Sequence, residues 1–361
     1  MEKFFSRCSC RNKNYLDFSV IVLFVYIFGC TFSSVCAFNL DIKKAIIQRG
    51  ETGSMFGYAV AQHLDQNRGW MLIGAPKAQT NLQPGIIKGG AVYRCSIDDQ
   101  RCQIIPFDLR GNDQQYNGTH HIDKEDKSHQ WFGATVQSSG VNGITLACAP
   151  RYVYKSALLD KVEPVGTCYI GRPLESSFQE FAPCRNSNWG FHRQVFCQAG
   201  FSATFTNDGN RVLIGAPGAW YWQGQVYNIF LDKGNQAVST KEATAIEDDS
   251  FRGYSSAVGN FNEDGIQDYV VGVPRAELLK GQITIYTQEL NIIRNITGEQ
   301  VGAYFGYALA VQDLDGNNLD DIIVGAPLYS NYTSKDSYDT GRVYVYYQNR
   351  QVGIIESNPI L

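Results

Sequence analysis

A stretch near the end of the chain constrains the fold more than any other, because four weaker copies of it come before it. Residues 301–327 read VGAYFGYALAVQDLDGNNLDDIIVGAP. An aromatic run that bears a glycine comes first, an acidic turn follows, and a β-branched run closes on Gly-Ala-Pro. Runs of this composition between turn residues predict two β-strands. The earlier copies, counted by their closing proline, cover residues 56–76, 132–150, 201–217 and 253–274.

Five copies at intervals of about 50 to 75 residues place the chain among repeat proteins, and a period of this length is typical of propeller blades. One such unit cannot bury both faces of its sheet, so the copies are expected to stack around an axis. The composition agrees: 44% hydrophobic residues, 13% aromatic residues and 35 glycines favour an all-β protein with many tight turns. A net charge of −4 gives no basic surface for nucleic acid.

Two of the turns have the spacing of a cation-binding loop. In each, oxygen-bearing side chains stand at loop positions 1, 3, 5 and 9, an alternation that turns them towards one hard cation. These residues are Asp313, Asp315, Asn317 and Asp321 in the last copy, and Asn260, Asn262, Asp264 and Asp268 in the copy before it. Position 7, held by Leu319 and Ile266, is expected to offer its backbone carbonyl while its side chain packs inward.

An EF-hand fits these turns poorly, because position 12 holds no glutamate and no helical pattern flanks either turn. We therefore predict two calcium-binding β-hairpin loops, with an asparagine-rich hairpin that holds no metal as the alternative. The turn at residues 207–210 in the third copy is too short to surround an ion and is predicted to be a plain turn.

The copies resemble the FG-GAP repeats of integrin α subunits, and longer runs carry the same resemblance. These runs are FNLD at 38–41, KSHQWFG at 127–133, PVGTC at 164–168, WYWQGQ at 220–225 and TGEQ at 297–300. The likeness is to subunits without an inserted I domain, of the insect position-specific type. It implies an all-β, seven-bladed propeller, of which residues 38–361 hold about the first five blades. It also implies an adhesion-receptor head that pairs with an integrin β subunit, binds extracellular matrix and carries two Ca²⁺ ions within this chain.

Residues 1–37 have the pattern of a secretory signal peptide, with a basic start, an apolar run at 18–29 and small residues before a cut. A membrane anchor is the alternative, although about a dozen apolar residues are short for a bilayer. The resemblance places a membrane-spanning segment beyond residue 361. The expected location is therefore the cell surface, or the medium if these residues are the whole product.

Of the ten cysteines, four precede residue 38 and six follow it, an even number that suits an oxidising compartment. Six cysteines allow fifteen pairings. Pairing of sequence neighbours, which the resemblance also implies, joins Cys95 to Cys102, Cys148 to Cys168 and Cys184 to Cys197. Structural zinc is the alternative, but no CxxC pair occurs. Glycosylation sequons begin at Asn117, Asn295 and Asn331.

One aromatic position recurs near the start of each copy. It is held by Tyr58, Phe201, Tyr254 and Tyr307, with Trp131 beside the equivalent place in the second copy. Core packing is one interpretation. The resemblance implies another, an aromatic cage that receives a basic side chain of the integrin β subunit through a cation–π contact.

The segment at 246–254 resembles the part of RGD-binding α subunits whose first aspartate receives the ligand arginine, which corresponds to Asp248. Tyr221 matches the aromatic residue beside that aspartate, and Trp220 precedes it in a run of three aromatics of which at least one is expected to be exposed. His192 stands where some of those subunits have a second aspartate, so the arginine would have fewer contacts. The alternatives are that Asp248 and Asp249 merely cap a strand end, or that the ligand is of a laminin type.

No enzyme constellation is evident, since G-x-S-x-G, H-E-x-x-H and P-loop motifs are absent from the sequence. A propeller of a secreted FG-GAP hydrolase and a stand-alone secreted binding propeller are the functional alternatives. The segment at 108–130 holds His120, His121 and His129, and we expect a solvated loop there in preference to a transition-metal site.

Overall fold

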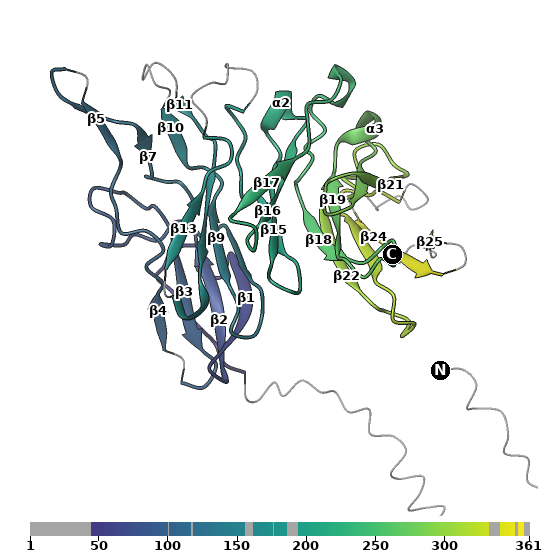
Figure 1. Cartoon of the computed structure of the whole chain (residues 1–361), viewed down its shortest axis with the longest axis horizontal. Helices are drawn as coiled ribbons and strands as arrows, with labels where there is room; N and C mark the ends of the chain where they lie inside the picture. The colour runs from purple at the N-terminus through teal and green to yellow at the C-terminus, as the bar shows by residue number, and fades with distance from the viewer. Residues whose placement is uncertain are drawn as a thin grey trace, which may run out of the picture. The chain divides into compact units, whose positions relative to one another are not determined.

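The computed structural model describes residues 45–99, 101–116, 118–155, 162–175, 177–185, 194–331, 340–350 and 353–356 (Figure 1). The predicted signal peptide, His192 and Asn117 lie outside these residues. The chain divides into two compact units, residues 1–47 and 48–361, and all the described strands belong to the second. No helix in the described part is long and apolar enough to cross a membrane.

Within the described ranges, five antiparallel sheets of four strands each follow one another along the chain, and their strands pair in sequence order. The first consists of β1(Ala59–Asp65), β2(Arg68–Ala75), β3(Ala91–Ser96) and β4(Cys102–Ile104). The second consists of β8(Thr135–Ser138), β9(Thr145–Ala149), β12(Thr167–Gly171) and β13(Phe178–Phe181). Each repeat copy supplies the first two strands of one sheet. The predicted all-β class is therefore confirmed.

The remaining three sheets have the same plan, and most of their strands are labelled in Figure 1. The third has β14(Ser202–Phe205), β15(Arg211–Ala216), β16(Gln225–Phe230) and β17(Gln236–Ser239). The fourth has β18(Ser256–Gly259), β19(Asp268–Val273), β20(Gln282–Tyr286) and β21(Ile292–Thr297). The fifth has β22(Ala308–Gln312), β23(Asp321–Ala326), β24(Arg342–Asn349) and β25(Gly353–Glu356).

Smaller elements connect the sheets. A hairpin of β5(Gln114–Tyr116) and β6(His121–Asp123) lies between the first two, beside a three-stranded sheet of β7(Glu125–Asp126), β10(Val153–Lys155) and β11(Val162–Glu163). Single helical turns are α2(Ala219–Trp222), α3(Ala276–Leu279), η2(Pro173–Glu175) and η3(Ala245–Glu247).

The first strands of successive sheets are neighbours in space, in the order β1, β8, β14, β18, β22. A glycine before the third strand of one sheet forms a parallel bridge to the start of the next sheet. The bridges are Gly90 to Phe132, Gly166 to Ala199, Gly224 to Arg252 and Gly281 to Phe305. Gly224 has a φ of +83°, and a Cβ built on it would lie 2.2 Å from the carbonyl oxygen of Arg252. Only glycine fits such an approach of backbone to backbone.

Hydroxyl side chains add a second contact at three junctions. Thr135 Oγ1 donates to the carbonyl oxygen of Gly200 at 2.7 Å, Ser202 Oγ to that of Gly253 at 2.8 Å, and Ser255 Oγ to that of Gly306 at 2.7 Å. Apolar side chains fill the space between and within the sheets, including the fully buried Leu213, Tyr269 and Tyr344. Neighbouring sheets are thus joined at fixed backbone points and share apolar cores.

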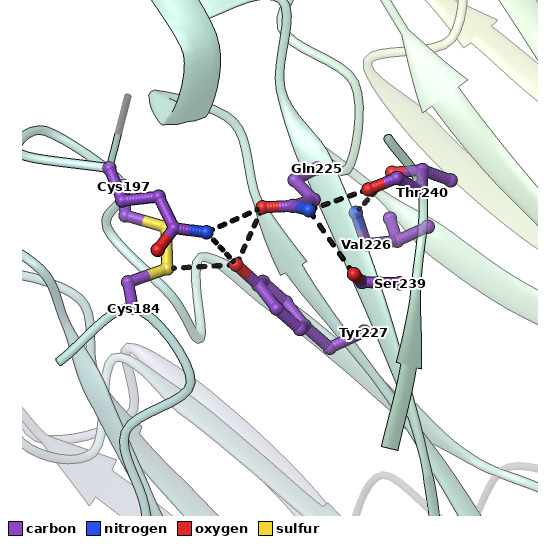
Figure 2. Close-up of a disulfide and its surroundings, with 8 residues drawn as sticks. Cys184, Cys197, Gln225, Val226, Tyr227, Ser239 and Thr240 are labelled. Carbon is purple, nitrogen blue, oxygen red and sulfur yellow. Dashed lines mark hydrogen bonds between the residues drawn. A yellow bond between two sulfur atoms is a disulfide. The ribbon is translucent and has the colours of Figure 1, made fainter. Parts of the chain in front are cut away.

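Three disulfides lie in this framework. Cys95 to Cys102 and Cys148 to Cys168 each join directly opposed residues of adjacent strands. Figure 2 shows the third, Cys184 to Cys197, beside the third sheet. There the Tyr227 hydroxyl lies 3.4 Å from Cys184 Sγ and donates to Gln225 Oε1 at 2.6 Å. This disulfide thereby lies against β16.

The segment at 108–130 corrects part of the prediction made for it. His120 and His121 are exposed, as a solvated loop requires, but Lys127 is only 2% exposed. Its Nζ donates to Asp108 Oδ2 at 2.8 Å and to the Gly111 carbonyl at 2.9 Å, and pairs with Glu125 Oε1 at 3.0 Å. The base of the segment is therefore a buried ion cluster, which the polar composition of the segment hid.

Burial alone would raise the pKa of Asp108 and of Glu125. Hydrogen bonds and the charge of Lys127 outweigh burial, and Tyr152 and Tyr169 also donate to these carboxylates, so both pKa values lie below their usual range. Lowered carboxyl pKa values stabilise the fold above the unfolded-state pKa, and this stabilisation is lost as the pH falls through the folded-state pKa.

We predict that Lys127→Met destabilises the protein by about 3–5 kcal/mol, because it removes the buried cation that two buried carboxylates share and leaves them with the more exposed Arg110 and Arg185. Urea unfolding at pH 7 measures this change. The exposed Arg101, which pairs with Asp99, serves as a control, since Arg101→Met should leave the midpoint unchanged. The loss from Lys127→Met should shrink as the pH is lowered through the titration of Asp108 and Glu125. An equal loss at acid and neutral pH would contradict the electrostatic explanation.

Candidate functional site

The turn between β22 and β23 brings its acidic residues together. Ligand oxygens of Asp313, Asp315 and Asp321 all lie within 4.8 Å of one another, the one such group of three His, Cys, Asp or Glu residues in the described structure. Asp321 is fully buried, and its Oδ2 accepts the N–H of Leu314 at 2.8 Å. The turn therefore brings three carboxylates close together, an arrangement that suits a hard cation.

Backbone donors hold the other carboxylates of this 313–321 loop. Asp313 Oδ1 accepts from Gly316 N at 2.7 Å and Asp313 Oδ2 from Asn318 N at 2.9 Å, while Asn317 Oδ1 accepts from Leu319 N at 2.7 Å. Three carboxylates thus converge in a loop whose backbone hydrogen bonds already fix its turn, and Asn317 lies beside Asp315. These residues fit calcium, whose ligands in proteins are carboxylate, amide and backbone carbonyl oxygens.

The 260–268 loop, between β18 and β19, repeats this plan with two carboxylates. Asp268 is buried and its Oδ2 accepts from Phe261 N at 3.0 Å, as Asp321 does from the equivalent position. Asp264 Oδ1 accepts from Ile266 N at 2.7 Å. Asn260 Oδ1 is buried without a hydrogen-bond partner. A buried, unsatisfied oxygen at loop position 1 is what a cation would stabilise.

Burial raises the pKa of Asp268 to about 6, and the nearby charge of Asp264 acts in the same direction, against the lowering effect of the Phe261 N–H. A positive charge beside such a carboxylate would favour its ionised form. The raised pKa and the unpaired Asn260 oxygen together support the fit of a cation to this second loop.

One expectation for the loops was wrong. Ile266 was expected to pack inward, but its side chain is 41% exposed, while Leu319 is half-buried. Ile266 follows Gly265, whose φ of +79° lets the chain turn at the tip of the loop, and residues 262–266 are all exposed. Position 7 is thus free to offer a carbonyl, but its side chain does not anchor the loop.

The predicted ligand residues come from two segments that lie side by side. Asp249 N donates to the Tyr221 carbonyl at 3.1 Å, and Phe251 N donates to that of Trp222 at 2.9 Å. Asp248 is exposed at the end of η3. The structure thus brings the backbone of the aromatic turn against the segment that carries Asp248.

The three aromatics of this turn have different surroundings. Tyr221 and Trp222 are 44% and 40% exposed, and Trp222 stacks on Phe196 with ring centroids 5.4 Å apart. Trp220, expected among the ligand residues, is only 9% exposed and belongs to the apolar core. Left-handed φ angles at Trp220 and Tyr221 turn the chain sharply here, so the first ring points in and the next points out. Trp220 therefore packs into the apolar core under the turn.

Sequence reasoning did not single out Gln223, whose side chain holds the carboxylate of Asp248. This buried side chain donates from Nε2 to Asp248 Oδ1 at 2.8 Å and to the carbonyls of Ala243 and Thr244 at 3.3 and 3.2 Å. Its Oε1 accepts the Ala243 N–H at 2.9 Å. The signal that could have revealed it is its place in the WYWQGQ run, directly after the aromatics.

The recurring aromatics form surface pairs between successive sheets. Ring centroids are 5.6 Å apart for Tyr58 and Trp131, 4.7 Å for Phe201 and Tyr254, and 5.0 Å for Tyr254 and Tyr307. Tyr58, Phe201 and Tyr307 are exposed, and the other two are half-buried. The series is therefore accessible, which disfavours the core-packing alternative.

Two of the three sequons fall on described residues. Asn295 is exposed on β21, the last strand of the fourth sheet, and Asn331 is half-buried after the fifth repeat. An exposed asparagine on an outer strand is accessible to glycosylation.

We predict that Gln223→Met destabilises the protein by about 1–3 kcal/mol, because it removes the hydrogen bonds that the buried Gln223 amide makes to the backbone of Ala243 and Thr244 and to Asp248, each of which contributes about 0.5–1.5 kcal/mol. Thermal or urea unfolding measures the effect. Gln236→Met, at an exposed position of β17, is the matched control and should change stability by less than about 0.5 kcal/mol. Equal effects of the two substitutions would refute the role given to Gln223.

Comparisons with known proteins bear on both the repeats and the site. The FG-GAP repeat family matches residues 305–346. Integrin alpha-PS2 of Drosophila melanogaster is 39% identical over 356 residues, covering 87% of this chain and 25% of that protein. Integrin alpha-5 of Xenopus laevis is 41% identical, covering 92% of this chain and 33% of its own length. Integrin alpha-V of Gallus gallus is 41% identical, with 83% and 30% covered.

Solved structures offer only a distant likeness. That of Saccharomyces cerevisiae Sqt1 superposes with a TM-score of 0.45 at 11% identity, covering 87% of this chain and 64% of that one, which is too low to bear on the fold. The curated relatives are much nearer in sequence, and the chain spans about a quarter to a third of their length.

Proposed function

Because this chain belongs to the integrin α family, we propose that residues 38–361 form part of the ligand-binding head of a cell-surface adhesion receptor. In this proposal the chain pairs with an integrin β subunit and binds an extracellular matrix ligand in a divalent-cation-dependent way. The observation that carries the proposal is the identity of about 40% with integrin α chains over nearly the whole sequence.

The five sheets serve in this proposal as blades of a seven-bladed propeller. Their first strands lie next to one another in chain order, and each junction repeats the same glycine bridge. Such regular stacking is the arrangement by which repeated sheets bury their faces. The relatives are three to four times as long as the matched stretch, which leaves room for the remaining blades.

Two calcium ions would occupy the 313–321 and 260–268 loops. In the first, Asp313, Asp315, Asn317 and Asp321 would supply side-chain oxygens, and Leu319 a carbonyl. In the second, Asn260, Asn262, Asp264 and Asp268 would do the same, with Ile266 as the carbonyl donor. The carboxylate cluster supports the first site, and the unpaired Asn260 oxygen supports the second.

We predict that the 313–321 loop binds calcium more tightly than the 260–268 loop, because it has three carboxylates against two. Calcium titration by calorimetry of the Asp313→Ala and Asp264→Ala variants should show loss of the tighter site in the first and of the weaker site in the second. Equal affinities would overturn the ordering, and a melting temperature that calcium does not change would overturn both sites.

The β-subunit contact would use the exposed aromatic series of Tyr58, Trp131, Phe201, Tyr254 and Tyr307. Their accessible rings and mutual contacts support a surface that receives a basic side chain through a cation–π interaction. The extracellular setting agrees with three disulfides and with the exposed sequon at Asn295.

The ligand would present an arginine to Asp248, as in an RGD sequence. The exposed carboxylate of Asp248, held by Gln223 beside the exposed Tyr221 ring, supports this assignment. A carboxylate can pair with a guanidinium through two parallel hydrogen bonds, which favours arginine over lysine. His192 would leave the site less acidic than a second aspartate would.

Asp248→Ala should abolish or strongly weaken adhesion of cells that express the full receptor to an RGD-bearing matrix, while surface expression stays unchanged. The neighbouring Asp249→Ala is the matched control and should retain adhesion. A laminin matrix without RGD forms the second arm of the assay. Unchanged adhesion of Asp248→Ala at normal surface levels would reject the arginine assignment, and adhesion to laminin alone would favour the other ligand type.

A further inference from the structure

The two cation loops contact each other directly. Asn260, at position 1 of the 260–268 loop, donates its backbone N–H to Asp320 Oδ2 at 2.8 Å. Asp320 has no place in the 1, 3, 5, 7, 9 pattern of its own loop, and it directly precedes Asp321, the buried carboxylate of that loop. A change in the position of Asp321 therefore moves the group that holds Asn260.

A second residue links the same two loops. Gln348, on β24 and buried, donates its backbone N–H to Asp321 Oδ1 at 2.9 Å and accepts from Asn317 Nδ2 at 3.0 Å through its carbonyl. When its side-chain amide is oriented to suit its neighbours, the nitrogen donates to the carbonyls of Asp320 at 3.0 Å and Asn260 at 3.1 Å. Gln348 thus contacts two candidate ligands of one loop with its backbone and the first residue of the other with its side chain.

This contact reaches a residue whose own oxygen has no partner. Asn260 Oδ1 is buried and unsatisfied, so no hydrogen bond to that oxygen fixes its position. The backbone N–H and carbonyl of Asn260 are the two groups that Asp320 and Gln348 hold. The fifth sheet therefore determines where the first ligand of the fourth sheet's loop stands.

The preceding junction contains an equivalent contact without a second cation loop. Asn207, in the short turn of the third sheet, donates its N–H to Gln267 Oε1 at 2.5 Å, and Gln267 stands one residue before Asp268 as Asp320 does before Asp321. The contact is thus a regular part of the junction between sheets. It joins two candidate cation loops only between the fourth and fifth sheets among those described.

We propose that the 260–268 and 313–321 loops bind cations as a coupled pair, with Asp320 and Gln348 as the positioning residues that carry the coupling. The proposal rests on the cation binding proposed above. A cation at the 313–321 loop fixes Asp321, and with it the Asp320 and Gln348 groups that orient Asn260. The second ion then binds a loop that is already ordered, which raises its affinity. By linkage, an ion at the 260–268 loop raises the affinity of the other loop by the same factor.

Hydrogen exchange with mass spectrometry tests the coupling, because it reports each loop separately in the full-length protein. Amide protection of peptides that cover 260–268 and 313–321 is followed as calcium is titrated. Asp320→Ala should raise the calcium concentration at half-protection of the 260–268 peptide about tenfold, a typical size for coupling between sites. The midpoint of the 313–321 peptide, measured when the other loop is silenced by Asp264→Ala, should not move.

Conservative and matched variants separate positioning from charge. Asp320→Asn keeps an oxygen acceptor for the Asn260 N–H and should retain the wild-type midpoint, whereas a purely electrostatic role would make it resemble Asp320→Ala. Gln348→Met removes the side-chain donors but leaves the backbone contacts, and should shift the 260–268 midpoint in the same direction as Asp320→Ala.

The outcomes separate this proposal from the one on which it depends. If Asp320→Ala moves neither midpoint, the coupling is overturned while cation binding stands. The coupling is also overturned if Asp320→Ala shifts the midpoint of the 313–321 peptide in the Asp264→Ala background, because the effect is then local to that loop. Absence of calcium protection in both wild-type loops overturns cation binding and the coupling with it. Selective weakening of the 260–268 loop, with rescue by Asp320→Asn, supports the coupled pair.

Discussion

Successive sheets in this protein depend on contacts between one backbone and another that leave no space for a side chain. A Cβ on Gly272 would lie 2.1 Å from the carbonyl oxygen of Gly306, and one on Gly224 would lie 2.2 Å from that of Arg252. The same repeat glycines also close their own sheets, since Gly306 N donates to the Gly325 carbonyl at 3.2 Å. The glycines of the repeat therefore determine both the pairing inside a sheet and its distance from the next.

The candidate sites depend on this arrangement because contacts that orient their residues cross the junctions. Asp248 and Gln223 come from segments that the Gly224 bridge brings together, and the bond between Asn260 and Asp320 spans the following junction. A side chain placed at a junction glycine would separate the sheets and so disturb sites whose own residues are unchanged. The loops supply the candidate ligand residues, and the glycine junctions determine how far apart loops of neighbouring sheets lie.

Local patterns in the sequence were sufficient for the strands, the acidic loops and the aromatic series. The strands and the acidic loops depend on residues a few positions apart, so the spacing of Asp313, Asp315 and Asp321 predicted their convergence. The aromatic series follows from one position that recurs in the repeat copies. The partners of Lys127, Gln223 and Gln348 were not predictable in this way. Lys127 and Gln223 bond to residues up to 25 positions away, and Gln348 reaches across to another sheet. Ile266 was misjudged because its place in the cation-loop pattern determines where its carbonyl is expected but not whether its side chain finds a core to pack against.

The glycine junctions also bear on how such a chain can diverge. A contact made by backbone atoms alone places no demand on the identity of neighbouring side chains. One copy can therefore carry an acidic loop, as at 313–321, and another a short turn, as at 207–210, while both keep the same spacing to their neighbours. Duplicated units held in this way can differ in their loops while the sheets keep their places, and a compensating change is needed only where a loop bonds to a side chain of the next copy, as Asn260 does to Asp320.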